Sequence, residues 1–403
     1  MKLLSSSRQA RRRWGAAISV VALSVTVLAP LSAQAAVPRK WVDEQVTFIL
    51  NNQLPSGAIT NFDTDVMPYF ANIAAIGLLD ANTAPSRAGA LKWMKWYLRH
   101  LNVSGPNTPA NSVFDYTYDA ATNIETATGD FDSVDSYAST TLNLASKAYS
   151  SGDPVLKKFV SRNIAKYEVI ANILNYGSPI GVRAANGLTI AKPSYPDEYT
   201  MDNAEVYSGL ADFARLESSL GRSSQASYYG SWAATTKDAI LSKLWNPAHN
   251  NWNAAFGENS DISIFYAGAT AQLWPILYGV IAPTDTKAIS TWKQFSVAYP
   301  TWYSGGIPDD YPWVSIARVA QLMGDTAHAS AHLTNLRLRY APGFASPSSC
   351  GDATCGQWYD NEAGWFITAN TSRPPVTATR PARSCPPAAH HGTCAGRARG
   401  PTR

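Results

Sequence analysis

Charged residues are scarce in this sequence. Asp, Glu, Lys and Arg make up only 15% of the 403 residues, whereas hydrophobic residues make up 45%. A disordered chain has the opposite balance, so we expect a folded body with a large core. The formal net charge is +4, but eleven of the 33 basic residues lie in 1–36 and 371–403, where no acidic residue occurs. The body between them is acidic, which argues against a nucleic-acid partner.

Histidine is also scarce, with six residues in the chain. His328 and His332 are four residues apart, but the sequence offers no third ligand beside them. No glycine-rich phosphate loop follows a strand pattern. We therefore expect no metal, no cofactor and no catalytic triad.

Cysteine occurs four times, always after residue 349. Cys350 and Cys355 flank a four-residue segment, and we predict a disulfide between them after export. A zinc site is the alternative, disfavoured because no histidine lies nearby in the sequence. Cys385 and Cys394 lie in 371–403, a segment rich in Pro and Arg that predicts a disordered tail.

The first 35 residues have the pattern of a secretory signal peptide. Basic residues end at Arg13, an apolar run follows to Pro30, and Ala33-Gln34-Ala35 fits a cleavage site. Three consecutive arginines leave open a twin-arginine signal. A retained membrane anchor is the alternative, disfavoured because the apolar run is short and a cleavage site follows. We expect a protein secreted to the exterior or cell envelope, monomeric and free of the membrane after cleavage.

Residues 36–370 show almost no alternating strand pattern and predict successive helices. The twelve expected helices are Val42–Gln53, Pro68–Leu79, Ser86–Leu101, Ser133–Tyr149, Pro154–Leu174, Asp202–Leu220, Ser223–Leu244, Ile262–Ile281, Asp285–Ala298, Trp313–Met323, Thr326–Tyr340 and Asn361–Ala369. Uncharged helices alternate with charged ones. This alternation predicts an all-α fold of six helical hairpins, with an inner ring of buried helices inside an outer ring. Ile262–Ile281 is long enough to cross a membrane, but its Gln, Gly and Pro residues favour a helix buried in the domain.

The loops alternate as well. Those from inner to outer helices are short, whereas those from outer to inner helices are long and should open at one end of the ring. The long loops contain fifteen acidic residues but only two basic ones, Arg183 and Lys192, and many Tyr and Trp residues. Carboxylates combined with aromatic rings suit a carbohydrate cleft. The alternative is that these acids cap helices and form turns, which we expect for at least half of them.

This organisation resembles the six-hairpin glycosidase-like superfamily, the (α/α)6 toroid. The local phrases Asp132-Ser-Val-Asp-Ser-Tyr137, Asp202-Asn-Ala-Glu-Val-Tyr207 and Gln357-Trp-Tyr-Asp-Asn-Glu362 contribute to the likeness. The resemblance implies a glycoside hydrolase acting on a poly- or oligosaccharide, with an inverting mechanism. It also implies a general acid at the third inner helix and a general base at the sixth.

These positions point to Asp202 or Glu205 as the acid and to Asp360 or Glu362 as the base. Asp202 and Glu205 lie on one helical face, and a carboxyl among tyrosines and other carboxyls should have a raised pKa, as a general acid requires. The alternative is that all four acids cap helices or lie satisfied in the core. The residues predicted to bind the sugar are Asp132, Asp135, Tyr137, Tyr199, Trp302, Tyr303, Asp309, Asp310 and Trp358.

Three other functions remain open from the sequence. A polysaccharide lyase of the same fold would use a Tyr base and need a cation such as Arg183 for the uronate carboxylate. A non-catalytic carbohydrate-binding protein would keep the aromatic rings but could lose a catalytic carboxylate. An isoprenoid cyclase is disfavoured, because Asp309-Asp310 is a short motif and the chain carries an export signal.

Overall fold

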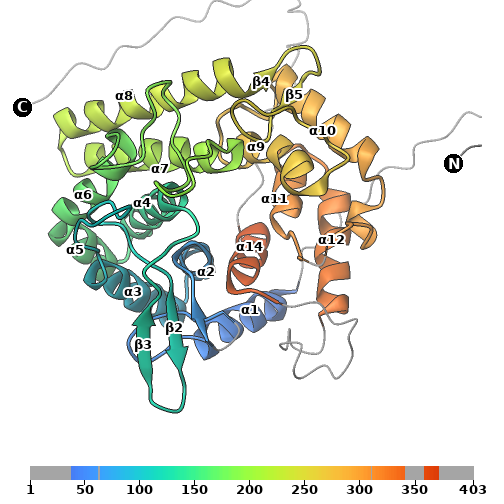
Figure 1. Ribbon diagram of the computed structural model, residues 1–403. Helices are drawn as coiled ribbons and strands as arrows, with labels where there is room; N and C mark the ends of the chain where they lie inside the picture. The colour runs from blue at the N-terminus through green and yellow to red at the C-terminus, as the bar shows by residue number, and fades with distance from the viewer. Residues whose placement is uncertain (1–37, 62–63, 310, 341–357, 372–403) are drawn as a thin grey trace, which may run out of the picture. The chain divides into compact units, whose positions relative to one another are not determined.

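The computed structural model describes residues 38–61, 64–309, 311–340 and 358–371 (Figure 1). Contacts divide the chain into Met1–Ala35 and Ala36–Arg403, and every described residue belongs to the second unit. The predicted signal peptide, Asp310, Cys350 and Cys355, and the tail from Ser372 onward lie outside the described residues. They therefore stay predictions.

Six helices form a closed inner ring, as predicted. They are α2 (Pro68–Ala81), α4 (Val134–Ser150), α7 (Thr200–Ser219), α9 (Trp274–Leu277), α11 (Ser315–Leu322) and α14 (Asp360–Thr371). Each packs against the next one in the chain, and α14 closes the ring by packing against α2 (Figure 1). The (α/α)6 arrangement predicted from alternating helix character is confirmed.

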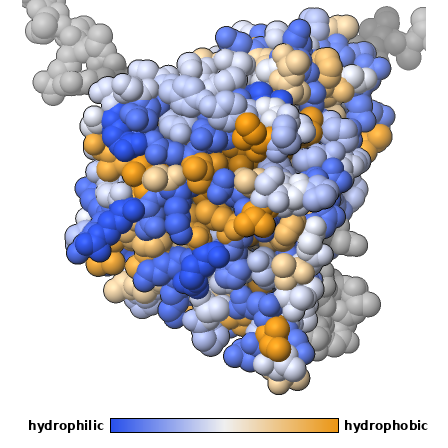
Figure 2. Space-filling model, turned by 60° about the vertical axis from the view of Figure 1, so that its left-hand side comes forward, coloured by the Kyte–Doolittle hydropathy of each residue, from blue (hydrophilic) through white to orange (hydrophobic). Residues whose placement is uncertain are grey.

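The outer helices each pack against the inner ring or its connecting segments. They are α1 (Arg39–Asn51), α3 (Ala84–Arg99), α5 (Pro154–Arg162), α6 (Ile164–Asn175), α8 (Ser223–Ala239), α10 (Thr286–Ala298) and α12 (Thr326–Arg339). One face of each is buried and the other is exposed, in keeping with their charge. On the face shown in Figure 2, hydrophilic residues are accordingly interspersed with hydrophobic ones.

Glycines allow the inner helices to approach closely. A Cβ on Gly77 of α2 would lie 2.5 Å from the Cα of Gly364 on α14, and one on Gly209 of α7 would lie 2.5 Å from the Ser139 carbonyl on α4. Real Cβ atoms do not approach so closely, so any larger residue would push the helices apart. These contacts fix the positions of four inner helices whose first turns carry polar residues.

The prediction of one continuous helix over Ile262–Ile281 is wrong. The chain forms a π-helical turn at Phe265–Ala269, a 3₁₀ turn at Thr270–Gln272 and then the short α9. Two causes are evident: Pro275 has no N–H to donate, and the Gln272 side chain bonds the backbone N–H and C=O of Trp252, both at 2.8 Å. Within the described part of the chain, no helix is both long and apolar enough to cross a membrane.

Two other expected helices are interrupted. Pro154–Leu174 divides at Asn163, whose side-chain amide donates to the Phe159 carbonyl at 2.8 Å. Ser223–Leu244 changes from α8 into a π-helical turn at Ile240–Leu244.

Short strands occur in the long loops and were not predicted. β1 (Asp65–Val66), β2 (Tyr116–Asp119) and β3 (Ile124–Ala127) form an antiparallel sheet. β4 (Trp245–Asn246) and β5 (Asn251–Trp252) pair separately, also antiparallel. Strands of two to four residues are too short to give a readable alternation.

Candidate active site

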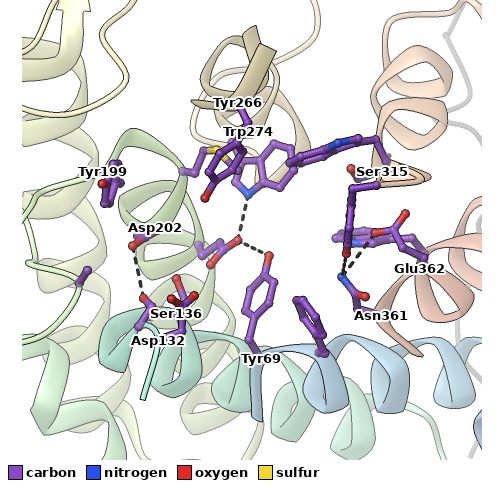
Figure 3. Close-up of a pocket in the computed structure, with 18 of the residues that line it drawn as sticks. Tyr69, Asp132, Ser136, Tyr199, Asp202, Tyr266, Trp274, Ser315, Asn361 and Glu362 are labelled. Carbon is purple, nitrogen blue, oxygen red and sulfur yellow. Dashed lines mark hydrogen bonds between the residues drawn. The ribbon is translucent and has the colours of Figure 1, made fainter. Parts of the chain in front are cut away.

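A cavity of about 440 Å³ opens at the N-terminal ends of the inner helices (Figure 3). Its size is within the range of about 300–1,000 Å³ that is usual for small-molecule sites. All six inner helices contribute residues to it. The lining residues are Tyr69, Phe70, Asp132, Ser133, Ser136, Ala191, Tyr195, Tyr199, Met201, Asp202, Glu205, Tyr266, Trp274, Asp309, Tyr311, Trp313, Ser315, Asn361, Glu362 and Trp365.

Glu205 of α7 is buried in this cavity, where the side chains of Ser136, Tyr69 and Trp274 hydrogen-bond to it. Its Oε1 accepts hydrogen bonds from the Tyr69 hydroxyl at 2.7 Å and from Trp274 Nε1 at 2.9 Å. Burial raises the pKa of Glu205 to about 7, although these donors favour the ionised form. Burial also raises the pKa of Tyr69 well above its ordinary value, so Tyr69 keeps its proton and remains a donor. Glu205 can therefore hold a proton near neutral pH.

Asp202 lies one helical turn before Glu205 and has a different environment. Its pKa is raised well above the ordinary value, first by burial and then by the charges of Asp135, Glu205 and Asp132. The Ser133 hydroxyl, which donates to Asp135 at 2.6 Å, lies 3.3 Å from Asp202 Oδ2. Each of these negative charges disfavours ionisation of Asp202, so Asp202 favours its protonated form when Glu205 is charged.

Glu362 of α14 lies on the opposite side of the cavity from Asp202 (Figure 3). The backbone N–H of Val314 donates to Glu362 Oε2 at 2.5 Å. Burial raises the pKa of Glu362 to about 7, while hydrogen bonds from Val314 and Tyr311 act in the opposite direction. Asn361 donates to the Tyr311 hydroxyl and, at 3.4 Å, to Glu362 Oε1. Glu362 is therefore a fixed carboxyl that can ionise near neutral pH.

Asp360, the other candidate base, does not line the cavity. Its Oδ1 accepts from Asn52 Nδ2 at 3.1 Å, and its backbone N–H donates to Asn61 Oδ1 at 3.2 Å. These contacts tie the start of α14 to α1 and the loop that follows α1. Asp360 therefore has a structural role and not a catalytic one, since its side chain is buried away from the cavity.

Three of the predicted sugar-binding residues line the cavity and two support it. Asp132, Tyr199 and Asp309 are lining residues. Asp135 lies beneath the surface, where it accepts from the Ser133 hydroxyl at 2.6 Å and the Thr189 hydroxyl at 2.7 Å. The Tyr137 hydroxyl accepts from the Asp132 N–H at 3.1 Å and donates to Asp115 at 2.7 Å. Asp135 and Tyr137 are thus placed to hold the first turn of α4 and not to touch a sugar.

Trp302, Tyr303 and Trp358 require a correction, because none of them lines the cavity. Trp302 is buried against Phe295 of α10 and against α12. Tyr303 stacks on His328 with ring centroids 4.0 Å apart, and Trp358 donates to Gln45 of α1 at 2.8 Å. These aromatic residues were assigned to the site because they lie in long loops. In the structure, Trp302 and Tyr303 pack against the outer helices, and Trp358 packs between α1 and α14.

Of the aromatic residues that line the cavity, the sequence predicted only Tyr199 as sugar-binding. The eight others are Tyr69, Phe70, Tyr195, Tyr266, Trp274, Tyr311, Trp313 and Trp365. Tyr69 follows the first residue of an uncharged inner helix, so its position near a helix start was a usable signal. Tyr266 and Trp274 lie in the segment wrongly expected to be one continuous helix. Tyr311 lies in a long loop and was not distinguished from the other aromatic residues there.

Cations are absent from the cavity lining within the described residues. Arg183 is buried elsewhere, where it donates to the Leu174 carbonyl at 2.7 Å, to the Gly187 carbonyl and to the Thr236 hydroxyl. The described residues also contain no cluster of three or more His, Cys, Asp or Glu side chains arranged to hold a metal ion. The chemistry that the lining itself offers is that of carboxyl groups.

No protein-family model matches the sequence, and no curated protein matches it. Solved structures do match. A glycosidase variant in complex with glucose is 12% identical, with a TM-score of 0.55 over 83% of this chain and 96% of its own. An α-amylase from Clostridium perfringens is 10% identical, with a TM-score of 0.53 over 83% and 97% of the two chains.

An α-mannanase from Bacteroides thetaiotaomicron is 12% identical, with a TM-score of 0.51 over 82% of this chain and 95% of its own. All three structures are glycoside hydrolases built on helical hairpins. At these identities the likeness establishes the fold. This chain has the (α/α)6 fold of the six-hairpin glycosidases.

Proposed function

We propose that this protein is a glycoside hydrolase that cleaves a poly- or oligosaccharide, with Glu205 as general acid and Glu362 as general base. One observation carries the proposal. Two buried carboxyl groups, from the third and sixth inner helices, line a single cavity from two sides, and each has a pKa of about 7. Two carboxyl groups on either side of a sugar are what glycoside hydrolysis requires.

In the proposed reaction, Glu205 protonates the glycosidic oxygen as the bond to the anomeric carbon breaks. Its Oε1 accepts hydrogen bonds from Tyr69 and Trp274. These donors stabilise the carboxylate that forms when the proton leaves. The hydrogen bonds therefore favour the product of proton transfer, while burial keeps the acid protonated beforehand.

In the same displacement, Glu362 accepts a proton from a water molecule that attacks the anomeric carbon. The Val314 N–H fixes Oε2, and Oε1, which accepts from Asn361 at 3.4 Å, has a second lone pair to orient the water. Attack from the side opposite to the leaving group inverts the anomeric centre. Inversion requires the two carboxyl groups to stand about 6.5–9.5 Å apart, so that the water fits between Glu362 and the sugar.

The lining also supports a class of substrate. Five carboxyl groups and no Lys or Arg line the cavity within the described residues. A uronate would bring a negative charge into this field without a partner, so neutral sugars and amino sugars are favoured. The lyase alternative loses support because Arg183 lies away from the cavity. Tyr195 and Tyr266 are 48% and 63% exposed at its edge, where their rings can stack on a sugar.

The test is to incubate the purified protein with a panel of neutral, amino-sugar and uronate polysaccharides and to measure released reducing ends. We expect reducing ends to be released from a neutral or amino-sugar polymer. ¹H NMR of the first product formed should show that its anomeric configuration is inverted relative to the substrate. The variant with Glu205→Gln and Glu362→Gln together is the control and should release nothing. Unsaturated products absorbing in the ultraviolet would identify a lyase, and tight binding without any release would identify a binding protein. The predicted signal peptide fits an extracellular polymer as the substrate.

A further inference from the structure

A single peptide group connects Glu362 to a histidine of the outer ring. His332 of α12 is 1% exposed, and its Nε2 lies 3.2 Å from the Trp313 carbonyl oxygen. A carbonyl oxygen can only accept, so Nε2 must carry the proton. The next N–H along the chain, that of Val314, donates to Glu362 Oε2 at 2.5 Å. The Trp313–Val314 peptide group thus has a hydrogen bond at each end.

The backbone around this peptide group is unusual. Trp313 has φ of +52°, in the left-handed region that bulky residues rarely adopt. Such a conformation persists only where the surroundings determine it, and it occurs preferentially at functional sites. Here the ring of Trp313 packs among Phe265, Trp274 and Tyr311, while its carbonyl accepts hydrogen bonds from His332 and from the Ile316 N–H at 3.1 Å. These two hydrogen bonds together fix which way the Val314 N–H points.

We propose that His332 is a positioning residue for Glu362, acting through the Trp313–Val314 peptide group. This inference rests on the proposed role of Glu362 as general base. A hydrogen bond to a peptide C=O polarises the group and strengthens the N–H as a donor. His332 thereby helps the Val314 N–H to stabilise the ionised form of Glu362. The histidine itself stays neutral in the working range, because burial lowers its pKa to about 4.

The other ionisable groups near this connection are accounted for. Tyr311 lies beside Glu362, and Tyr69, Asp202, Glu205 and Asp309 line the same cavity. Asp309 and Arg339 share a second, adjacent cavity with His332. None of these groups contacts the Val314 N–H, so a change at His332 reaches Glu362 through the peptide group.

The experiment measures the ionisation of Glu362 directly. The chain has eight glutamates, so ¹³C labelling of glutamate carboxyls gives few signals, and Glu362→Gln assigns the one that belongs to Glu362. His332→Leu removes the donor, whereas His332→Gln keeps an N–H near the position of Nε2. His328→Leu is the matched control, because His328 lies on the same helix, is partly exposed and bonds Asp325.

We expect His332→Leu to raise the titration midpoint of Glu362 by about one pH unit, as for a weakened hydrogen bond to a carboxylate. His332→Gln and His328→Leu should stay within a few tenths of a unit of the parent. An unchanged midpoint in His332→Leu overturns the inference. Equal shifts in His332→Leu and His332→Gln overturn it too, because they would show that only packing matters.

If circular dichroism shows that His332→Leu does not fold, His332→Asn replaces it, because its amide is too short to reach the carbonyl and should give the same upward shift. The acidic limb of kcat/KM should move together with the midpoint. If the parent protein hydrolyses no polysaccharide, the proposed function fails while the carboxyl titration still decides the role of His332.

Discussion

The α7 side and the α14 side of the cavity hold their carboxyl groups in different ways. On the α7 side, Glu205 is held by side-chain donors from α2 and α9, and neighbouring acids add repulsion. On the α14 side, Glu362 is held by a backbone N–H, and burial alone raises its pKa. Both carboxyls have a pKa of about 7, so the pKa values alone do not distinguish acid from base. Repulsion from neighbouring acids favours a held proton on the α7 side, and on this ground we propose the acid on α7 and the base on α14.

The strongest test of this assignment is to neutralise each side separately. Glu205→Gln and Glu362→Gln should each lower turnover by about 10²–10⁴-fold, the usual contribution of a general acid or base. The parent enzyme should show a bell-shaped kcat/KM profile around neutral pH, since both groups have a pKa of about 7. In Glu205→Gln the residual activity should lose its alkaline limb, and in Glu362→Gln its acidic limb.

The reverse pattern of limbs would exchange the two roles. Full turnover in both variants on an identified substrate would remove both residues from the chemistry. Melting temperatures complete the test. Neither substitution removes a hydrogen bond that the fold needs, so a large loss of stability would point to a structural role instead.

The raised pKa values of Glu205 and Glu362 also predict how the stability of the fold depends on pH. The folded-state pKa of Glu362 is raised to about 7 from an ordinary 4.5, so the folded protein binds the proton more tightly than the unfolded chain. Its contribution to stability is therefore fully present below about pH 4.5 and is lost as the pH rises through 7. A shift of this size corresponds to a free energy on the order of 3 kcal/mol.

Urea denaturation at pH 5 and pH 8 measures this contribution. Glu362→Gln should be less sensitive to pH than the parent, and so should Glu205→Gln. Glu258→Gln is the control, because Glu258 is exposed and should leave the pH dependence unchanged. If the parent protein were more stable at pH 8 than at pH 5, the idea of buried, protonated carboxyls on both sides would be wrong.

The sequence predicted the ring well because the signal repeats. Uncharged segments recur in three of the inner helices, and short and long loops alternate through all six hairpins, which together leave few other folds. The prediction failed where one element departs from the repeat: α9 is a single turn, because Gln272 and Pro275 interrupt the helix. An apolar stretch predicts burial but not whether the buried chain is helical.

Some of the candidate acids could also be predicted from the repeat of helical hairpins. Asp202 and Glu362 lie in the first turns of inner helices and Glu205 one turn further along α7, and the ring brings these helix starts together. Asp360 and Glu362 could not be separated from the sequence, because which of two nearby acids faces the cavity depends on the rotation of α14. The donors Tyr69, Trp274 and the Val314 N–H come from three other elements, so no local pattern indicates them.

The smallest expected effect distinguishes the two acids of the α7 side. Asp202 has a pKa well above its ordinary value and is neutral when Glu205 ionises, so Asp202→Asn replaces one neutral group with another. We expect kcat/KM at the pH optimum to change by less than about tenfold, with both limbs of the profile kept. The measurement is the full pH profile beside that of Glu205→Gln on the same substrate. If Asp202→Asn instead loses 10²-fold or more together with the alkaline limb, as an acid catalyst would, then Asp202 donates the proton. Glu205 would then serve, with Tyr69 and Trp274, to keep Asp202 protonated, and the contrast between a crowded acid side and an isolated base side would still hold.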